Sequence, residues 1–156
     1  MRVGHGYDVH RLGSDKPLKV GGVVLGDRGP ISHSDGDVLF HALIDGLLGA
    51  AGLGDMGTYY PDSDPRYLGV SSALLAQQVM QKVRALLYEL GNADLTVILK
   101  APKLAPHISE MRDHLAKALA VDRRAINIKA KSANGVGAVG RGEAMEAYAV
   151  VLLENA

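Results

Sequence analysis

The sequence contains no cysteine and no tryptophan, and it has a single phenylalanine among its 156 residues. Without cysteine the chain can form neither disulfides nor thiolate metal sites, so any metal must be held by nitrogen or oxygen ligands. The same absence leaves the redox compartment open. Because aromatic residues make up only 4 % of the chain, leucine, valine, isoleucine and alanine must fill the core, and a hydrophobic content of 47 % supplies enough of them.

An excess of charge is missing as well. Seventeen basic residues balance 17 acidic ones, so nothing favours binding to nucleic acid or to an anionic membrane. No apolar run approaches the roughly 18 residues of a membrane span. A protein without net charge also resists association poorly, which fits an oligomer better than a monomer. We therefore expect one domain over residues 1–156, with no nucleic-acid or membrane partner and a cytoplasmic location.

Strand and helix patterns alternate along the chain and predict an α+β fold, with helices packed on one face of a roughly four-stranded mixed sheet. Glycines at Gly4 and Gly6 indicate a close backbone approach in the first strand. Ser34 to Asp37 resembles a capping box, and Gly91 is expected to end the second helix. The expected strands are 2–10, 18–25, 94–100, 125–132 and 146–153, and the expected helices are 35–51, 72–90 and 106–120.

The last strand is hydrophobic on both sides at Val150, Val151, Leu152 and Leu153. A strand of this kind is buried on both faces. The pattern alone leaves two interpretations open: the second face meets another subunit, or the strand is sandwiched within one chain.

Asp8, His10 and His41 are candidate ligands of a metal ion. Residues two apart in a strand point to the same side, so Asp8 and His10 can face one ion. With His41 they form a set of two imidazoles and one carboxylate with an open fourth position, which is typical of catalytic zinc. Asp37 and Asp45 lie one turn from His41 on the expected helix, so either is a candidate to orient its ring. The alternative is chance, because short Asp-x-His pairs are common.

A second pattern suggests a site for phosphate. His33 and Ser34 lie at the start of the first expected helix, where unpaired N–H groups and the helix dipole favour an anion. The glycine-rich tract 132–143 supplies further backbone donors and the guanidinium of Arg141. Such a tract is also what an ordinary turn between two strands looks like, and it lacks the lysine-serine pattern of nucleotide-binding P-loops. Together with a metal, these residues favour a pocket for a phosphorylated substrate.

Six segments together resemble the 2-C-methyl-D-erythritol 2,4-cyclodiphosphate synthase family, in order and in spacing, over nearly the whole chain. These segments are 4–10, 33–37, 53–57, 61–65, 101–103 and 140–143. The resemblance implies a homotrimer with active sites between subunits, in the non-mevalonate route to isoprenoid precursors. It also implies release of CMP from 4-diphosphocytidyl-2-C-methyl-D-erythritol 2-phosphate as a cyclic diphosphate forms, in a bacterial cytoplasm or, after removal of a targeting segment, a plastid-type organelle.

The resemblance also implies roles for single residues. Asp8, His10 and His41 would hold zinc, with manganese or cobalt as alternatives, and His33 and Ser132 would be the catalytic residues that donate to phosphate oxygens. A Mg²⁺ or Mn²⁺ ion would accompany the diphosphate. The substrate-binding residues would be Asp8, His10, His33, Ser34, Asp55, Met56, Gly57, Tyr60, Pro61, Asp62, Ser63, Asp64, Leu99, Lys100, Ala101, Pro102, Lys103, Leu104, Ala105, Lys131, Ser132, Ala133, Asn134, Ala138 and Arg141.

Two positions depart from the family pattern. Asn134 stands where the family usually has a glutamate that binds the second metal, and an amide brings no negative charge to a hard cation. Ala138 stands where a bulkier aromatic residue is frequent, near a threefold channel that can hold an isoprenoid diphosphate. An arginine-glutamate pair closes that channel in the family, and Arg141 and Glu143 match it.

Two other functions remain open at this point. A metal-dependent phosphoester hydrolase would use the open metal position to activate water, with Asp55 or Asp62 as base. A trimeric binding protein for isoprenoid or nucleotide ligands would use zinc only structurally. That protein would need a fourth protein ligand, for which no residue has convincing spacing.

Overall fold

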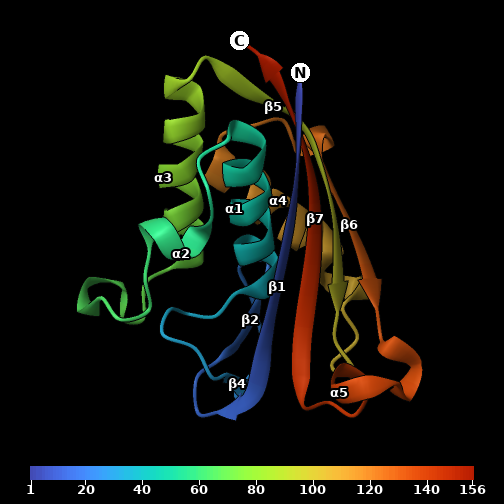
Figure 1. Cartoon of the computed structure of the whole chain (residues 1–156). Coiled ribbons are helices and arrows are strands. Elements are labelled where there is room, and N and C mark those ends of the chain that lie inside the picture. Colours follow the sequence, from blue (N-terminus) through green and yellow to red (C-terminus); the bar gives the residue numbers. More distant parts are fainter.

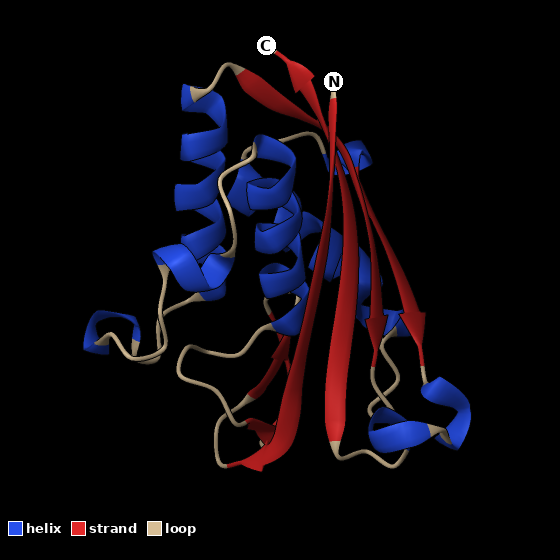
Figure 2. Ribbon diagram, in the orientation of Figure 1, coloured by secondary structure: helices blue, strands red, loops and turns tan.

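The computed structural model describes all 156 residues and has a helical layer on one face of a five-stranded sheet (Figures 1 and 2). The sheet has the order β4-β1-β7-β5-β6, in which only the β5–β6 pair is parallel. Its strands are β1 (Arg2–Ser14), β4 (Gly29–Pro30), β5 (Tyr88–Ile98), β6 (Ile126–Lys131) and β7 (Ala144–Asn155). The predicted α+β class is confirmed, and the expected four strands become five because the two-residue β4 adds to one edge.

The remaining elements are a two-stranded hairpin, the helices and short 3₁₀ turns. β2 (Leu18–Val20) and β3 (Val23–Gly26) form a separate hairpin. The helices are α1 (Val38–Ala51), α2 (Met56–Tyr59), α3 (Ser72–Ala85), α4 (Ile108–Leu119) and α5 (Gly137–Gly140). Short 3₁₀ turns are η1 (Pro65–Tyr67), η2 (Ala105–His107), η3 (Arg123–Ala125) and η4 (Ala133–Gly135). None of the helices has both the length and the apolar character needed to cross a membrane.

Helix α1 lies directly against the backbone of β1, and two glycines make this approach possible. A Cβ atom on Gly4 would lie 2.0 Å from the carbonyl oxygen of Gly46, and one on Gly6 would lie 1.8 Å from that of Ala42. The expectation of a close approach at these glycines is confirmed. Alternation along the strand then places Asp8 and His10 on the same face of β1 as the glycines, toward α1.

The start of α1 differs from the prediction. The helix begins at Val38, and its N-cap is Asp37, whose carboxylate accepts hydrogen bonds from the N–H groups of Leu39 and Phe40. The predicted cap, Ser34, instead accepts from the N–H of Gly36, which has a φ of +70°. A left-handed residue cannot continue a helix, so the helix cannot start before it.

The end of the second expected helix was also wrong. α3 stops at Ala85, and β5 begins at Tyr88, so that Gly91 lies inside a strand and ends no helix. Between them Leu87 takes a φ of +62°, and Leu90 pairs with Leu153 of β7. The sequence pattern gives no sign of this turn, because the apolar residues Leu86 and Leu87 form it and continue the helical spacing.

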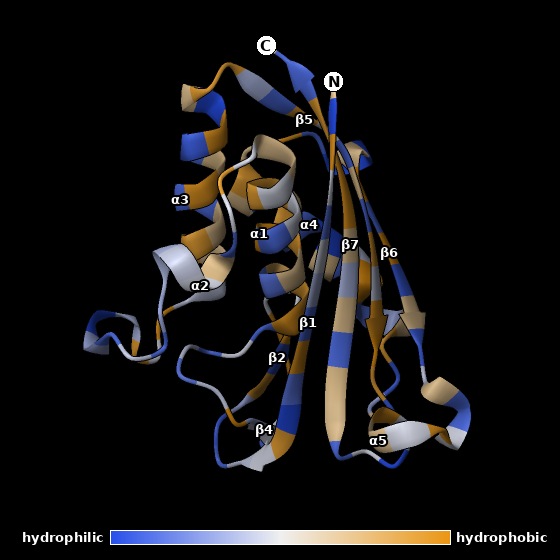
Figure 3. Ribbon diagram, viewed as in Figure 1, coloured by the Kyte–Doolittle hydropathy of each residue, from blue (hydrophilic) through white to orange (hydrophobic).

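The outer face of the sheet carries exposed apolar side chains. Figure 3, in which the ribbon is coloured by hydropathy, shows hydrophobic positions along β1 and β7. Val150 is 48 % exposed, whereas Val151 and Leu153 are fully buried toward the helices. The interpretation of β7 as a strand sandwiched within one chain is therefore wrong. The exposed apolar residues of this outer face are Val3, Tyr7, Val9, Tyr148 and Val150.

We predict opposite effects for two glycine-to-alanine substitutions near this contact. Gly6→Ala should lower the free energy of unfolding by about 3 kcal/mol or more, since the new methyl group meets helix backbone that has no room to yield. Gly49→Ala, at an exposed position within α1 with only ordinary contact at 3.9 Å, should raise it by about 0.5–1 kcal/mol. Urea unfolding measures both. Equal effects of the two substitutions would contradict the close β1–α1 contact.

Candidate metal centre and active site

Asp8 and His10 of β1 and His41 of α1 meet at one point, as predicted. The Asp8 Oδ2 atom lies 2.9 Å from His10 Nε2 and 3.0 Å from His41 Nδ1, and the two ring nitrogens are 3.1 Å apart. His41 is almost fully buried, while Asp8 and His10 are partly exposed. The three atoms form the single cluster of potential metal ligands in the chain.

The chemistry of these three atoms fits a cation. Carboxylate oxygens and the unprotonated nitrogens of neutral imidazoles are all electron-pair donors, so they repel one another at about 3 Å unless a positive charge lies among them. Oxygen and imidazole nitrogen together suit zinc, and they also suit manganese or cobalt. A divalent ion held by Asp8, His10 and His41 would keep a position open for a further ligand.

Asp8 is ionised in this arrangement. Burial raises the pKa of its carboxyl group, but the adjoining imidazoles of His10 and His41 lower it by more, so this pKa lies well below the usual range. The carboxylate is therefore available as a ligand throughout the neutral range.

The outward nitrogen of His41 contacts two serines. His41 Nε2 lies 2.8 Å from Ser72 Oγ and 3.1 Å from Ser34 Oγ. The prediction that Asp37 or Asp45 orients this ring is wrong. Those carboxylates accept hydrogen bonds from backbone N–H groups instead, and for Asp45 the donor is Met56, at 2.7 Å.

Asp37 joins the start of α1 to the β2–β3 hairpin. Its two oxygens accept from the N–H groups of Gly21, Gly22, Leu39 and Phe40 at 2.7–3.3 Å. Burial raises the pKa of Asp37 to about 6, although the hydrogen bonds from these N–H groups lower it. The group is still largely ionised at neutral pH, where a carboxylate with four donors anchors the helix that carries His41.

A cavity of about 500 Å³ opens beside the three metal-ligand candidates. Its wall includes these predicted substrate-binding residues: Asp8, His10, His33, Ser34, Met56, Gly57, Tyr60, Pro61 and Asp62. Asp55, Ser63 and Asp64 do not line it. The Asp55 carboxylate caps α2 through Thr58, and that of Asp64 pairs with Arg66.

The other predicted residues lie at the end of the sheet where β5 and β6 finish and β7 begins. A second cavity of about 500 Å³ is lined by Leu99, Lys100, Ala101, Pro102 and Arg141, together with Leu12 of β1 and residues of the β2–β3 region. Lys131 ends β6 and Ser132 follows it, Ala133 and Asn134 lie in η4, and Ala138 lies in α5. All of them except the half-buried Ala133 are exposed. Lys103, Leu104 and Ala105 continue from the second cavity toward η2.

One chain therefore does not bring together His33 and Ser132, the two predicted catalytic residues. The metal cluster extends from β1, whereas Ser132 follows β6, and β7 and β5 lie between these strands. Three strand spacings amount to roughly 14 Å across the sheet. The predicted site consists of two half-sites on one molecule: the metal half-site of the first cavity, and the loop half-site of residues 99–105 and 131–141.

Comparison with known proteins identifies the family. The model of the YgbB family matches residues 1–154. The chain belongs to the YgbB family. A 2-C-methyl-D-erythritol 2,4-cyclodiphosphate synthase from Geobacter sulfurreducens is 49 % identical over 156 residues, 99 % of each chain. A protein of the same name from Moorella thermoacetica is 51 % identical over 98 % of this chain and 94 % of its own.

The fold of the family is found in solved structures as well. A 2C-methyl-D-erythritol-2,4-cyclodiphosphate synthase in its CDP-bound form superposes with a TM-score of 0.88 at 38 % identity, covering 98 % of this chain and 100 % of that one. Membership of the family and the mixed α+β architecture are thus confirmed.

Some residues of the metal half-site were missed by sequence reasoning. The cavity wall also contains Asp45, Tyr67 and Leu75, and Ser72 contacts the metal-ligand candidate His41. The sequence indicated Asp45, four residues after His41 on α1, only as a candidate to orient the His41 ring and not as part of a cavity wall. Ser72 had none, since its contact with His41 spans 31 positions along the chain.

We predict that Asp37→Asn weakens the fold around the metal centre. The amide would place an NH₂ group against a backbone N–H, for example that of Gly22 at 2.7 Å, and leave buried donors without acceptors. We expect a loss of about 1–3 kcal/mol in the free energy of unfolding, measured in urea. Asp122→Asn, at an exposed cap, is the matched control and should cost less than about 1 kcal/mol. An unchanged stability of Asp37→Asn would contradict the anchoring role.

Proposed function

We propose that this protein is a 2-C-methyl-D-erythritol 2,4-cyclodiphosphate synthase. It converts 4-diphosphocytidyl-2-C-methyl-D-erythritol 2-phosphate to the 2,4-cyclodiphosphate and releases CMP. The observation that carries this proposal is the convergence of Asp8, His10 and His41 on a cavity, in a chain that matches synthases over its full length. Relatives solved as CDP complexes support a cytidyl diphosphate substrate.

The reaction needs no protein nucleophile. An oxygen of the substrate's own 2-phosphate forms a bond to the β-phosphorus, while the bond from that phosphorus to the oxygen that leaves with CMP breaks. Both partners are anionic, so the protein must neutralise charge and fold the substrate into attack geometry. A divalent ion on Asp8, His10 and His41 would supply a positive charge that polarises a phosphate oxygen.

His33 and Ser34 act at the wall of the metal half-site. His33 Nε2 donates to the carbonyl oxygen of Asp64 at 2.8 Å, so only Nδ1 is left to reach a phosphate, and it donates when the ring is protonated. Ser34 Oγ contacts His41 Nε2 and the N–H of Gly36, so its hydroxyl supports the metal ligand as much as the substrate. The cavity wall from Met56 to Asp62 would then hold the erythritol moiety.

A homotrimer would complete the site. The loop half-site of one subunit, with Ser132 and residues 99–105 around the cytosine, would face the metal half-site of a neighbour. Two observations support this assembly: one chain keeps the half-sites apart, and the outer sheet face exposes valines and tyrosines that water does not favour. We place the enzyme in the cytoplasm, or in a plastid-type organelle.

The loop half-site carries two further proposals. Asn134, which is exposed and lies 3.3 Å from Ser132 Oγ through its Oδ1 atom, would bind Mg²⁺ or Mn²⁺ weakly, so the substrate phosphates would hold most of that ion. Near the threefold axis the exposed Ala138 would leave room for an isoprenoid diphosphate. The Arg141–Glu143 ion pair, with 2.7 Å between Nε and Oε1, would close that channel.

Phosphorus NMR of the purified protein with the cytidyl substrate, zinc and a Mg²⁺ series tests the reaction. We expect CMP and a cyclic diphosphate in equal amounts. Asn134→Glu should lower the Mg²⁺ concentration that the reaction requires. Removing the metal, or replacing His41 by alanine, should abolish turnover while the protein remains folded. Linear phosphate products would favour a hydrolase instead. Unfolding on metal removal would favour a binding protein with structural zinc, although that role usually takes a fourth ligand.

Mixing two inactive variants tests the shared site. His41→Ala lacks the metal half-site and Ser132→Ala lacks the loop half-site, so each alone should be inactive. After unfolding and joint refolding in equal amounts, random trimers should recover about one quarter of wild-type activity, because about one site in four pairs two intact halves. Each variant refolded alone is the control. No recovery in the mixture, despite trimers in light scattering, would place both halves of the site within one chain.

A further inference from the structure

The ring of His41 is held from the side opposite Asp8 and His10. Its Nδ1 atom faces Asp8 and His10, and its Nε2 atom faces Ser72 Oγ at 2.8 Å. Ser72 is the first residue of α3 and is fully buried, so no water competes for this contact. The ring is therefore tied to a second helix that contributes no metal ligand.

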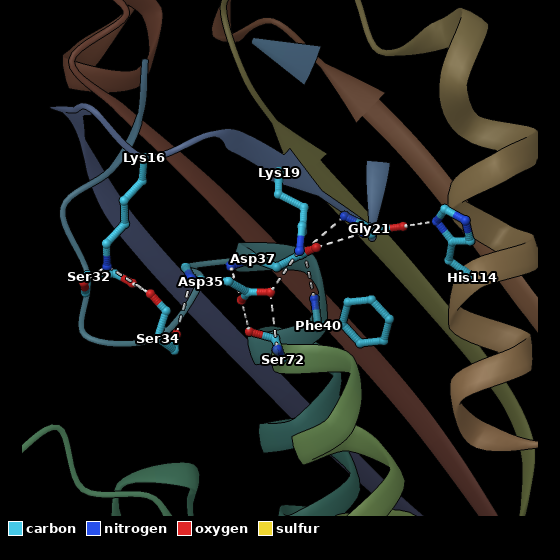
Figure 4. A network of polar contacts seen from close by, with 12 residues as sticks. Lys16, Lys19, Gly21, Ser32, Ser34, Asp35, Asp37, Phe40, Ser72 and His114 are labelled. Carbon is cyan, nitrogen blue, oxygen red and sulfur yellow. Dashed lines mark hydrogen bonds and ion pairs between the residues drawn. The ribbon is translucent and has the colours of Figure 1, made fainter. Parts of the chain in front are cut away.

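The hydrogen bonds around Ser72 have a defined direction. Asp35 receives the backbone N–H of Ser72 at 3.2 Å and approaches Lys19 Nζ at 3.4 Å, and both of these groups only donate. The Asp35 carboxylate is therefore an acceptor, and the short contact between Ser72 Oγ and Asp35 Oδ1 uses the single hydroxyl proton of Ser72. Figure 4 shows Ser72 at the end of its helix, directed at Asp35, with Lys19 on the far side of the carboxylate.

This direction determines the tautomer of His41. Because the Ser72 proton is directed at Asp35, Ser72 Oγ can only accept from His41, so the ring carries its proton on Nε2. Nδ1 is then left with a free electron pair, directed at the point where Asp8 and His10 converge. A chain of hydrogen bonds that ends in a carboxylate, as this one does at Asp35, also makes the metal-binding nitrogen of the imidazole more basic.

We propose that Ser72 and Asp35 are positioning residues of the metal centre, which hold His41 in the tautomer and orientation that binds the ion. Lys19 balances the charge of Asp35 at the outer end of this chain. The proposal rests on the proposed function, since it needs an ion at Asp8, His10 and His41. It adds residues of α3 and of the loop before α1 to the metal half-site, although neither touches substrate.

Two substitutions interrupt the chain in different ways. Ser72→Ala removes the acceptor for His41 Nε2 and leaves only Ser34, at 3.1 Å. Asp35→Asn keeps the shape of the side chain. In one orientation its NH₂ group faces the backbone N–H of Ser72, so two donors meet. In the other orientation the NH₂ group donates to Ser72 Oγ, so the Ser72 proton turns toward His41 and favours the wrong tautomer. Ser71→Ala is the matched control, because Ser71 is exposed and its side chain makes no capping hydrogen bond.

The measurements are the zinc affinity, by competition with a chromogenic chelator, and the visible spectrum of the Co²⁺-loaded protein. We expect Ser72→Ala and Asp35→Asn to bind zinc about 10–100-fold more weakly and to alter the cobalt bands, with Ser71→Ala like the wild type. Urea unfolding of the metal-free variants separates these effects from a loss of folding. Should Ser72→Ala not fold, Asp35→Asn decides by the same criteria.

The outcomes distinguish this proposal from the proposed function. Zinc affinities of both variants within about twofold of wild type would overturn the positioning role while leaving the metal centre intact. A wild-type protein that binds neither zinc nor cobalt would overturn both. Weaker zinc binding in Ser72→Ala and Asp35→Asn but not in Ser71→Ala, with all three variants stably folded, would support the hydrogen-bond chain from His41 to Asp35.

Discussion

The metal half-site depends on the contact between the backbones of β1 and α1. Gly4 and Gly6 lack the side chains that would hold the two elements apart, and they let α1 settle on the strand. Two residues further along the same face, Asp8 then lies within hydrogen-bond distance of His41. Bringing a strand and a helix this close places the three ligand atoms within 3.1 Å of one another.

Two aspartates near this contact then fix the position of α1 and the orientation of His41. Asp37 ties the start of α1 to the β2–β3 hairpin through four backbone donors, and Asp35 lies two residues before it in the same loop. Neighbouring aspartates thus have separate tasks: one anchors the helix and the other, through Ser72, reaches the far side of His41. A cation held by Asp8, His10 and His41 would suit a reaction between two phosphates, where charge must be neutralised without large rearrangement.

Much of this could be predicted from the sequence, where the signal is local. Strand alternation placed Asp8 and His10 together, and the fold class followed from the order of the elements. The cap of α1 was misassigned because Ser34, Asp35 and Asp37 all offer side-chain acceptors within four residues, and only the left-handed Gly36 decides among them. Leu87 hid the end of α3 for a similar reason, since a leucine rarely marks a left-handed turn.

The rest depends on contacts between distant parts of the chain. Ser72 meets His41 across 31 positions and Asp35 across 37, and no periodicity connects such residues. The division into two half-sites follows from the strand order β1-β7-β5-β6, which the sequence pattern does not specify.

X-ray absorption at the zinc edge, on the zinc-loaded protein, tests the central claim most directly, because it reports the ligands of the ion itself. The account predicts a four-coordinate ion with two imidazole nitrogens at about 2.0–2.1 Å and oxygen in the remaining positions. It also predicts that His41→Ala loses one imidazole or the ion. An ion bound by oxygens alone, or an unchanged spectrum in that variant, would contradict the assignment of Asp8, His10 and His41 as the metal site.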